Sequence, residues 1–261
     1  MRRELLEGKV AVVSGVGPGL GRSIALMLAG EGADIALGAR HTSVLEEVAA
    51  EVEALGRRAV WQATDVSRPE QCEALVARAA EELGGVDIVV NSAAASNRDE
   101  RLSDGDPDGW REAIDVSYFG SLLLTRAALP LLRQRGGGHV VMVGTMSTRD
   151  PQPGEGAYAA AKAAVLMATR TLAVELGREN IRVNAVNPGF IQGEHIQAGI
   201  RERAKARGIS AAEFEAEIVA KTALGYLPGP DEIAGSVLFL VSDLSRPVTG
   251  HVLDCNSGMW M

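Results

Sequence analysis

Short runs of apolar and β-branched residues recur along the chain, separated by longer segments whose apolar residues follow helical spacing. Most of the short runs are continuously apolar and do not alternate with polar residues. This pattern is typical of strands that are covered on both faces of a parallel sheet. We therefore predict strands at residues 9–15, 33–39, 58–64, 86–92, 139–145, 181–187 and 250–255.

The segments between these runs are predicted to be helices. In residues 42–56 the apolar positions fall on one helical face, and Ser43 with Glu46 matches a capping box. Residues 69–85 and 109–134 show the same spacing. Strands and helices that alternate over the whole length predict an α/β protein with a single doubly wound, Rossmann-type parallel sheet and helices on both faces. No linker or internal repeat divides the chain, so we expect residues 1–261 to form one domain.

Composition and charge exclude several classes of protein. Of the 261 residues, 46% are hydrophobic and 23% are charged, which is typical of a globular protein. The formal net charge of −8 argues against a nucleic-acid partner, because phosphate backbones bind to basic surfaces. Cys72 and Cys255 are too few for a disulfide scaffold, which favours a cytoplasmic location. We expect no membrane partner, since no run reaches roughly 18 apolar residues, and no metal site, since the four histidines are scattered.

A glycine-rich turn follows the first predicted strand and leads into a helix. Gly15, Gly19 and Gly21 match the pattern G-x-x-x-G-x-G, whereas neither G-x-G-x-x-G nor the P-loop fits. Such a turn brings backbone N–H groups and a helix N-terminus close to a phosphate, and dinucleotides bind at this position of a doubly wound sheet. By itself the turn leaves two alternatives open: a purely structural role, and a methyltransferase that binds an adenosyl cofactor.

The end of the second predicted strand bears on the kind of dinucleotide. A carboxylate at this position would hold a ribose 2′-hydroxyl, but the chain has Ala39 and Arg40 here. A guanidinium can pair with a 2′-phosphate, and no carboxylate repels one. The sequence therefore predicts a preference for a phosphorylated dinucleotide, with a solvated Arg40 as the alternative.

One phenol and one ammonium stand in the otherwise alanine-rich segment 155–165. Tyr158 and Lys162 are four residues apart, so they lie on one face of the predicted helix. A free phenol has a pKa of about 10, and a nearby ammonium lowers that pKa because it favours the phenolate. The pair therefore suits proton exchange near neutral pH, although its spacing alone could be coincidental.

Further motifs follow in order along the chain. They are Asp65–Val66 after the third predicted strand, Asn91 and Ala93 after the fourth, Pro188–Gly189 after the sixth, and Thr249, Gly250 and Asp254 near the C-terminus. Together with the glycine turn and Tyr158-x-x-x-Lys162, they resemble the short-chain dehydrogenase/reductase family over residues 9–258. The order and spacing of the motifs carry the resemblance, since each motif is common on its own.

The resemblance implies an oxidoreductase that transfers a hydride between a nicotinamide cofactor, NADP(H) by preference or NAD(H), and a ketone or secondary alcohol. Tyr158 would exchange a proton with the substrate oxygen, while Lys162 would lower the pKa of Tyr158 and hold the nicotinamide ribose. Thr145 stands where the family usually has a serine that orients the substrate oxygen, with Ser147 as a nearby alternative. Ser117 replaces an asparagine of the family's proton relay, so that relay would be weakened.

The resemblance also assigns the cofactor contacts, with Asp65 against the adenine ring. The implied cofactor-binding residues are Gly15, Pro18, Gly19, Leu20, Arg40, Asp65, Val66, Asn91, Ala93, Tyr158, Lys162, Pro188, Gly189 and Ile191. Gly193 stands where the family commonly has a threonine, so one contact to the nicotinamide amide would be missing.

The family's homotetramer and its substrate-covering segment, here about residues 190–225, are implied in the same way. Two alternatives stay open. The basic run at Arg201, Arg203, Lys205 and Arg207 could meet the anionic handle of a carrier-bound 3-oxoacyl chain, or it could be a solvated helix face. The departures at Ser117 and Thr145 also allow a catalytically weak dinucleotide sensor.

Overall fold

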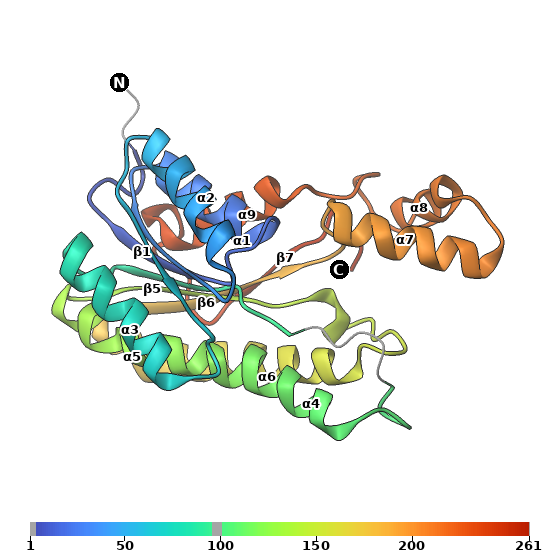
Figure 1. Cartoon of the computed structure of the whole chain (residues 1–261), viewed down its shortest axis with the longest axis horizontal. Coiled ribbons are helices and arrows are strands. Elements are labelled where there is room, and N and C mark those ends of the chain that lie inside the picture. The colour runs from blue at the N-terminus through green and yellow to red at the C-terminus, as the bar shows by residue number, and fades with distance from the viewer. Residues whose placement is uncertain (1–3, 96–100, 261) are drawn as a thin grey trace.

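The computed structural model describes residues 4–95 and 101–260 and contains a parallel sheet of seven strands (Figure 1). The strand order is β3-β2-β1-β4-β5-β6-β7, and every neighbouring pair is parallel. The strands are β1 (Val10–Ser14), β2 (Asp34–Ala39), β3 (Ala59–Ala63), β4 (Ile88–Asn91), β5 (Gly138–Val143), β6 (Ile181–Pro188) and β7 (Val252–Cys255). Each strand coincides with one of the predicted apolar runs, so these predictions are confirmed.

Helices cover both faces of the sheet (Figure 1). One face carries α1 (Leu20–Gly30), α2 (Thr42–Ala54) and α9 (Pro230–Val241), and the other carries α3 (Pro69–Arg78), α5 (Gly120–Gln134) and α6 (Gly156–Leu176). Successive residues of a strand point to opposite faces. Accordingly, Ala11 and Val13 of β1 join one apolar core, while Val10 and Val12 join the other. The predicted doubly wound sheet is confirmed, and its two cores explain why the strands are continuously apolar.

Three predicted details differ from the structure. Residues 69–85 are not one regular helix, because α3 ends at Arg78 and a wider helical turn follows at Ala79–Leu83. Residues 109–134 are not one regular helix, because a wider helical turn at Asp115–Phe119 joins α4 (Pro107–Ile114) to α5. Wide turns of this kind often occur near functional sites. The predicted capping box at Ser43 is wrong. The N-cap of α2 is His41, so Ser43 lies inside the helix, and no side chain caps its start. A capping box does form between Ser210 and Glu213, at the start of α8 (Ala211–Val219).

The carboxyl ends of the strands meet at one edge of the sheet. The order of the strands reverses between β1 and β4, and ligands of doubly wound sheets bind at such a point. Beyond this edge, α7 (Glu194–Arg207) and α8 project from the body of the molecule (Figure 1). Within the part of the chain that the structure describes, no helix is long and apolar enough to cross a membrane.

Candidate active site

A continuous groove crosses the carboxyl edge of the sheet. Its first part is a cavity of about 270 Å³ that the ends of β1, β2, β3 and β4 surround. Its second part, of about 430 Å³, lies beside β5 and β6. Ser92 and Ala94 line both cavities, so the two join at the point where the strand order reverses.

The glycine turn combines close packing with open space. Gly15 has φ +75°, and a Cβ placed on it would lie 2.4 Å from the backbone nitrogen of Ala93. A Cβ on Gly21 would lie 2.2 Å from the carbonyl oxygen of Gly15. Gly17 and Gly19 have no atom near the position of a Cβ, and Gly19 starts α1 without a side-chain cap. The N-terminus of α1 is thus approachable by an anion, so the turn fits the pyrophosphate of a dinucleotide.

Arg40 and Asp65 line the first cavity together with Val66 and Ala93. Arg40 is exposed directly after β2. The carboxylate of Asp65 accepts hydrogen bonds from the hydroxyl of Ser67 at 2.7 Å and from its backbone N–H at 3.0 Å. These bonds, together with the charge of Arg40, hold the pKa of Asp65 below its ordinary value. This end of the groove therefore presents a fixed carboxylate and a guanidinium that reaches into solvent.

Two predicted residues lie beneath the groove, outside the linings of both cavities. Asn91 is buried at the end of β4, where its Nδ2 donates to Thr125 Oγ1 at 3.0 Å. Ser117 is fully buried in the wide turn before α5, and its hydroxyl oxygen accepts from the backbone N–H of Ala95 at 3.3 Å. These contacts tie the end of β4 and Ala95 to α5 and the turn before it, and the relay role of Ser117 stays a prediction.

Tyr158 and Lys162 line the second cavity from the first turns of α6. The Nζ of Lys162 donates to the carbonyl of Val143 at 2.7 Å and lies 6.0 Å from the centre of the Tyr158 ring. Lys162 is only 1% exposed, and this burial lowers its pKa to about 8. The predicted neighbours therefore face one cavity, with an ammonium held close to the phenol.

The loop between β5 and α6 supplies a chain of hydrogen-bonded side chains. Thr145 lines the second cavity, and its hydroxyl donates to Ser147 Oγ at 3.2 Å. The hydroxyl of Ser147 donates to a carboxylate oxygen of Glu155 at 2.7 Å. The other oxygen of Glu155 lies 3.7 Å from the guanidinium of Arg203 on α7. Sequence reasoning missed Glu155, and the signal that could have found it is a lone carboxylate three residues before Tyr158.

The remaining predicted residues also line the second cavity. They are Pro18, Gly19, Leu20, Pro188, Gly189 and Ile191. Gly193 lies in the same wall, and nothing stands within 4 Å of the position of a Cβ there. The wall is therefore open at the position where the family commonly has a threonine.

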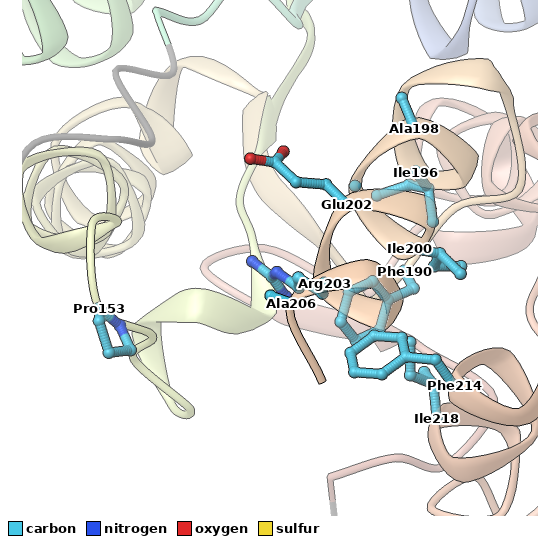
Figure 2. Close-up of a pocket in the computed structure, with 11 residues that line it drawn as sticks. Pro153, Phe190, Ile196, Ala198, Ile200, Glu202, Arg203, Ala206, Phe214 and Ile218 are labelled. Carbon is cyan, nitrogen blue, oxygen red and sulfur yellow. The ribbon is translucent and has the colours of Figure 1, made fainter. Parts of the chain in front are cut away.

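An outer pocket of about 410 Å³ adjoins the second cavity, and Ile196 lines both (Figure 2). Most of its lining residues are apolar, among them Phe190, Phe214 and Ile218, and two are charged, Glu202 and Arg203. Figure 2 shows Pro153 across the pocket from the side chains of α7 and α8. The outer pocket thus extends the groove under the segment that follows β6.

The basic run on α7 is largely balanced by carboxylates. Arg201 pairs with Glu194, and Arg207 pairs with Glu217 of α8. Arg203 faces Glu155, as described above. The run therefore presents less free positive charge than its sequence indicates. Within the described residues, no group of histidine, cysteine and carboxylate side chains could hold a metal ion.

Comparisons with known proteins agree over nearly the whole chain. The family model described as Enoyl-(Acyl carrier protein) reductase matches residues 15–260. The short chain dehydrogenase/reductase astE of Aspergillus oryzae is 36% identical over 256 residues, which cover 97% of this chain and 95% of that protein.

Two solved structures have closely similar folds. The L-sorbose reductase of Gluconobacter frateurii, complexed with NADPH and L-sorbose, has a TM-score of 0.92 and 31% identity and covers 99% of this chain and 98% of its own. The carveol dehydrogenase of Mycobacterium avium, in complex with NAD, has a TM-score of 0.91 and 32% identity, and the match covers 98% of this chain and 99% of that one.

Proposed function

The chain belongs to the short-chain dehydrogenase/reductase family and is an NAD(P)-dependent oxidoreductase, and on this premise we propose that it interconverts a ketone and a secondary alcohol with NADP(H). The observation that carries the proposal is that Tyr158, Lys162 and Thr145 line one cavity of a groove that continues to the glycine turn.

The proposed chemistry divides between the cofactor and three side chains. The nicotinamide, when bound, supplies or accepts the hydride. During reduction, Tyr158 donates its phenolic proton to the carbonyl oxygen, and during alcohol oxidation it accepts that proton. Lys162 stabilises the phenolate and lies at the end of the groove that would hold the nicotinamide ribose. Thr145 donates a hydrogen bond to the substrate oxygen, where negative charge develops.

The preference for NADP(H) rests on Arg40. It follows β2 directly, and its exposed guanidinium can reach a 2′-phosphate at the mouth of the first cavity. Asp65 is the carboxylate of that cavity, and it is already engaged by its hydrogen bonds to Ser67. We assign the backbone of the glycine turn to the pyrophosphate, and Asp65 and Val66 to the adenine.

We further propose that the substrate carries an apolar group. The segment of about 190–225 supplies most of the lining of the outer pocket, in which apolar side chains such as Phe190 and Phe214 stand beside the charged Glu202 and Arg203. Burial of each methylene in such a pocket favours binding by about 0.8 kcal/mol. We therefore expect a substrate with a hydrocarbon group to bind in this pocket more tightly than a sugar with its many hydroxyls.

Self-assembly and location complete the proposal. The outer faces of α5 and α6, together with the wide turn before α5, expose apolar side chains, including Met167 of α6, which is 58% exposed, and Phe119 of the turn, which is 49% exposed. An apolar hollow that Leu122 and Leu172 line lies between them. We propose that these faces pack together in a homotetramer, since exposed apolar patches of this kind mark interfaces. Cys72 and Cys255 are both free thiols, which supports a cytoplasmic location.

A carrier-bound 3-oxoacyl substrate is the second candidate function, favoured by the 32% identity over 254 residues to a 3-oxoacyl-[acyl-carrier-protein] reductase of Thermotoga maritima. The ion pairs of Arg201 and Arg207 weigh against it, because they leave less charge for an anionic carrier. A sensor without turnover is disfavoured by the cavity that Tyr158 shares with Thr145.

The test begins with separate titrations of the protein with NADPH and with NADH, in which nicotinamide fluorescence reports binding. We expect NADPH to bind more tightly, and Arg40→Ala to weaken NADPH by about 10- to 100-fold without changing NADH, as for the loss of a charge-assisted hydrogen bond. Arg133→Ala is the control, because Arg133 pairs with Glu179 and lines neither part of the groove.

Turnover is then measured with NADPH and a series of ketones. Tyr158→Phe should keep cofactor binding and lose nearly all turnover. Failure of both cofactors to bind would refute the proposed function. A preference for NADH would refute only the role of Arg40, and full turnover in Tyr158→Phe would refute the proposed proton donor.

A further inference from the structure

Glu155 is a buried carboxylate that the proposed chemistry leaves without a role. It is only 6% exposed and immediately precedes the first residue of α6. A carboxylate at this position of a helix often caps the free N–H groups, but Glu155 makes no side-chain cap. Its carboxylate instead points back across the loop that joins β5 to α6, where it accepts the hydroxyl proton of Ser147 at 2.7 Å.

An ordinary ion pair does not explain the burial either. The guanidinium of Arg203 lies 3.7 Å from Glu155, which is longer than a hydrogen bond, and the side chain of Arg203 is 44% exposed. Partly exposed pairs of this kind contribute little to stability. The short bond from Ser147 is therefore the main contact of this carboxylate, and bonds to an ionised acceptor are about twice as strong as neutral ones.

We propose, on the basis of the proposed function, that Glu155 is a positioning residue that sets the place of Thr145 relative to Tyr158. Its bond to Ser147 joins two positions eight apart in the chain, one in the turn that follows β5 and one at the start of α6. Ser147 in turn holds Thr145 twice, since its N–H donates to Thr145 Oγ1 at 3.3 Å and its Oγ accepts from that hydroxyl at 3.2 Å. Tyr158 stands in the first turn of α6, three residues after Glu155.

The same bond decides which hydroxyl serves the substrate. The single hydroxyl proton of Ser147 is used in its hydrogen bond to Glu155. Thr145 lines the cavity, whereas Ser147 does not. When Thr145 turns its proton from Ser147 Oγ toward a carbonyl oxygen, the bond from the Ser147 N–H to Thr145 Oγ1 still holds it in place. Arg203, which lines the outer pocket, links this arrangement to α7.

The experiment compares Glu155→Ala with Glu155→Gln in the full-length enzyme, with NADPH and one ketone. We expect Glu155→Ala to lower kcat by about 10- to 100-fold, with the KM and the NADPH Kd within about threefold, since small misplacements of reacting groups cost this much. Glu155→Gln should restore kcat to within about threefold, because its amide oxygen still accepts the Ser147 proton.

A double-mutant cycle with Ser147→Ala separates positioning from a merely structural role. If Glu155 acts through Ser147, the double variant should lose no more kcat than Ser147→Ala alone. Asp34→Asn is the matched control, since the Asp34 side chain is as buried as that of Glu155, at 8% exposed, but lies at the opposite edge of the sheet. It should lower the Tm and leave kcat unchanged.

Three results would overturn the role of Glu155. They are additive losses of kcat in the cycle, failure of Glu155→Gln to restore kcat while its Tm is normal, and a loss confined to Tm. A wild-type enzyme that binds NADPH but turns over no ketone would instead count against the proposed function, so the two failures are distinguishable.

Discussion

Replacing Lys162 by methionine separates what this side chain costs in stability from what it contributes to the proposed chemistry. Lys162 is 1% exposed, and burial lowers its pKa from 10.5 to about 8. At about 1.4 kcal/mol per pH unit, the buried ammonium opposes folding by roughly 3 kcal/mol at pH 7. Methionine removes this cost but leaves the carbonyl of Val143 without its donor, a loss of about 1–2 kcal/mol. We therefore expect Lys162→Met to be more stable than wild type by about 1–2 kcal/mol at pH 7.

The sign of the pH dependence follows from the same shift. Below pH 8 both states of the wild type hold the proton on Lys162, so the cost of burying the charge is present in full. Between pH 8 and 10.5 the unfolded chain keeps the proton while the folded protein releases it, so the wild type gains stability as the pH rises. The advantage of Lys162→Met should therefore shrink from about pH 8 and reverse near the middle of this window.

The assay is urea unfolding of both proteins without cofactor at pH 7, 8, 9 and 10, with NADPH-dependent turnover measured in parallel. Turnover of the variant should fall by at least about 100-fold, because Tyr158 loses the ammonium that favours its phenolate. A variant that is less stable than wild type at pH 7, or a stability difference that does not change with pH, would refute the reasoning about the buried charge. Turnover that survives would refute the role assigned to Lys162.

Two further substitutions test the glycine turn and the outer pocket. Gly15→Ala should lower the free energy of unfolding by about 2–3 kcal/mol, because its Cβ would collide with the backbone of Ala93 at a positive φ, whereas Gly17→Ala should leave stability unchanged in urea unfolding. Gly199 lines the outer pocket and has space for a Cβ, so Gly199→Leu should fill part of the pocket. We expect kcat/KM for long apolar ketones to fall by about 10- to 60-fold, which corresponds to the loss of two to three buried methylenes, while kcat/KM for butanone stays unchanged. Gly177→Leu, at an exposed position away from the pocket, is the control, and equal losses on both substrates would contradict the proposed apolar arm.

Local patterns in the sequence were sufficient to predict the fold. The strands of a doubly wound sheet are covered on both faces, so each one is a continuous apolar run, and all the predicted runs became strands. The glycine turn and the Tyr158–Lys162 spacing were predictable for a similar reason. Each depends on backbone geometry within a few residues, a tight strand-to-helix turn in one case and one helical turn in the other.

Contacts between distant segments were not predictable in this way. Glu155 accepts a hydrogen bond from Ser147 across a loop. It also lies near Arg203, which belongs to α7, a helix that follows β6 in the chain. No periodicity links such positions, because side-chain partners across a fold depend on how helices pack on the sheet. The same is true of the bond between Ser117, in the wide turn before α5, and the backbone N–H of Ala95, while the relay role that the resemblance implies for Ser117 stays a prediction.

The sequence by itself determined the sheet, its strand boundaries to within a few residues, the family resemblance and the pair of side chains that face one cavity. Only the tertiary structure decided that the basic run of α7 is paired with carboxylates, that an apolar pocket adjoins the groove, and that a buried carboxylate holds Thr145 through Ser147. The physical reason is the range of the interactions. Hydrophobic periodicity and turn geometry act between near neighbours in the chain, whereas charge pairing, cavity shape and hydroxyl orientation are set by residues that only folding brings together.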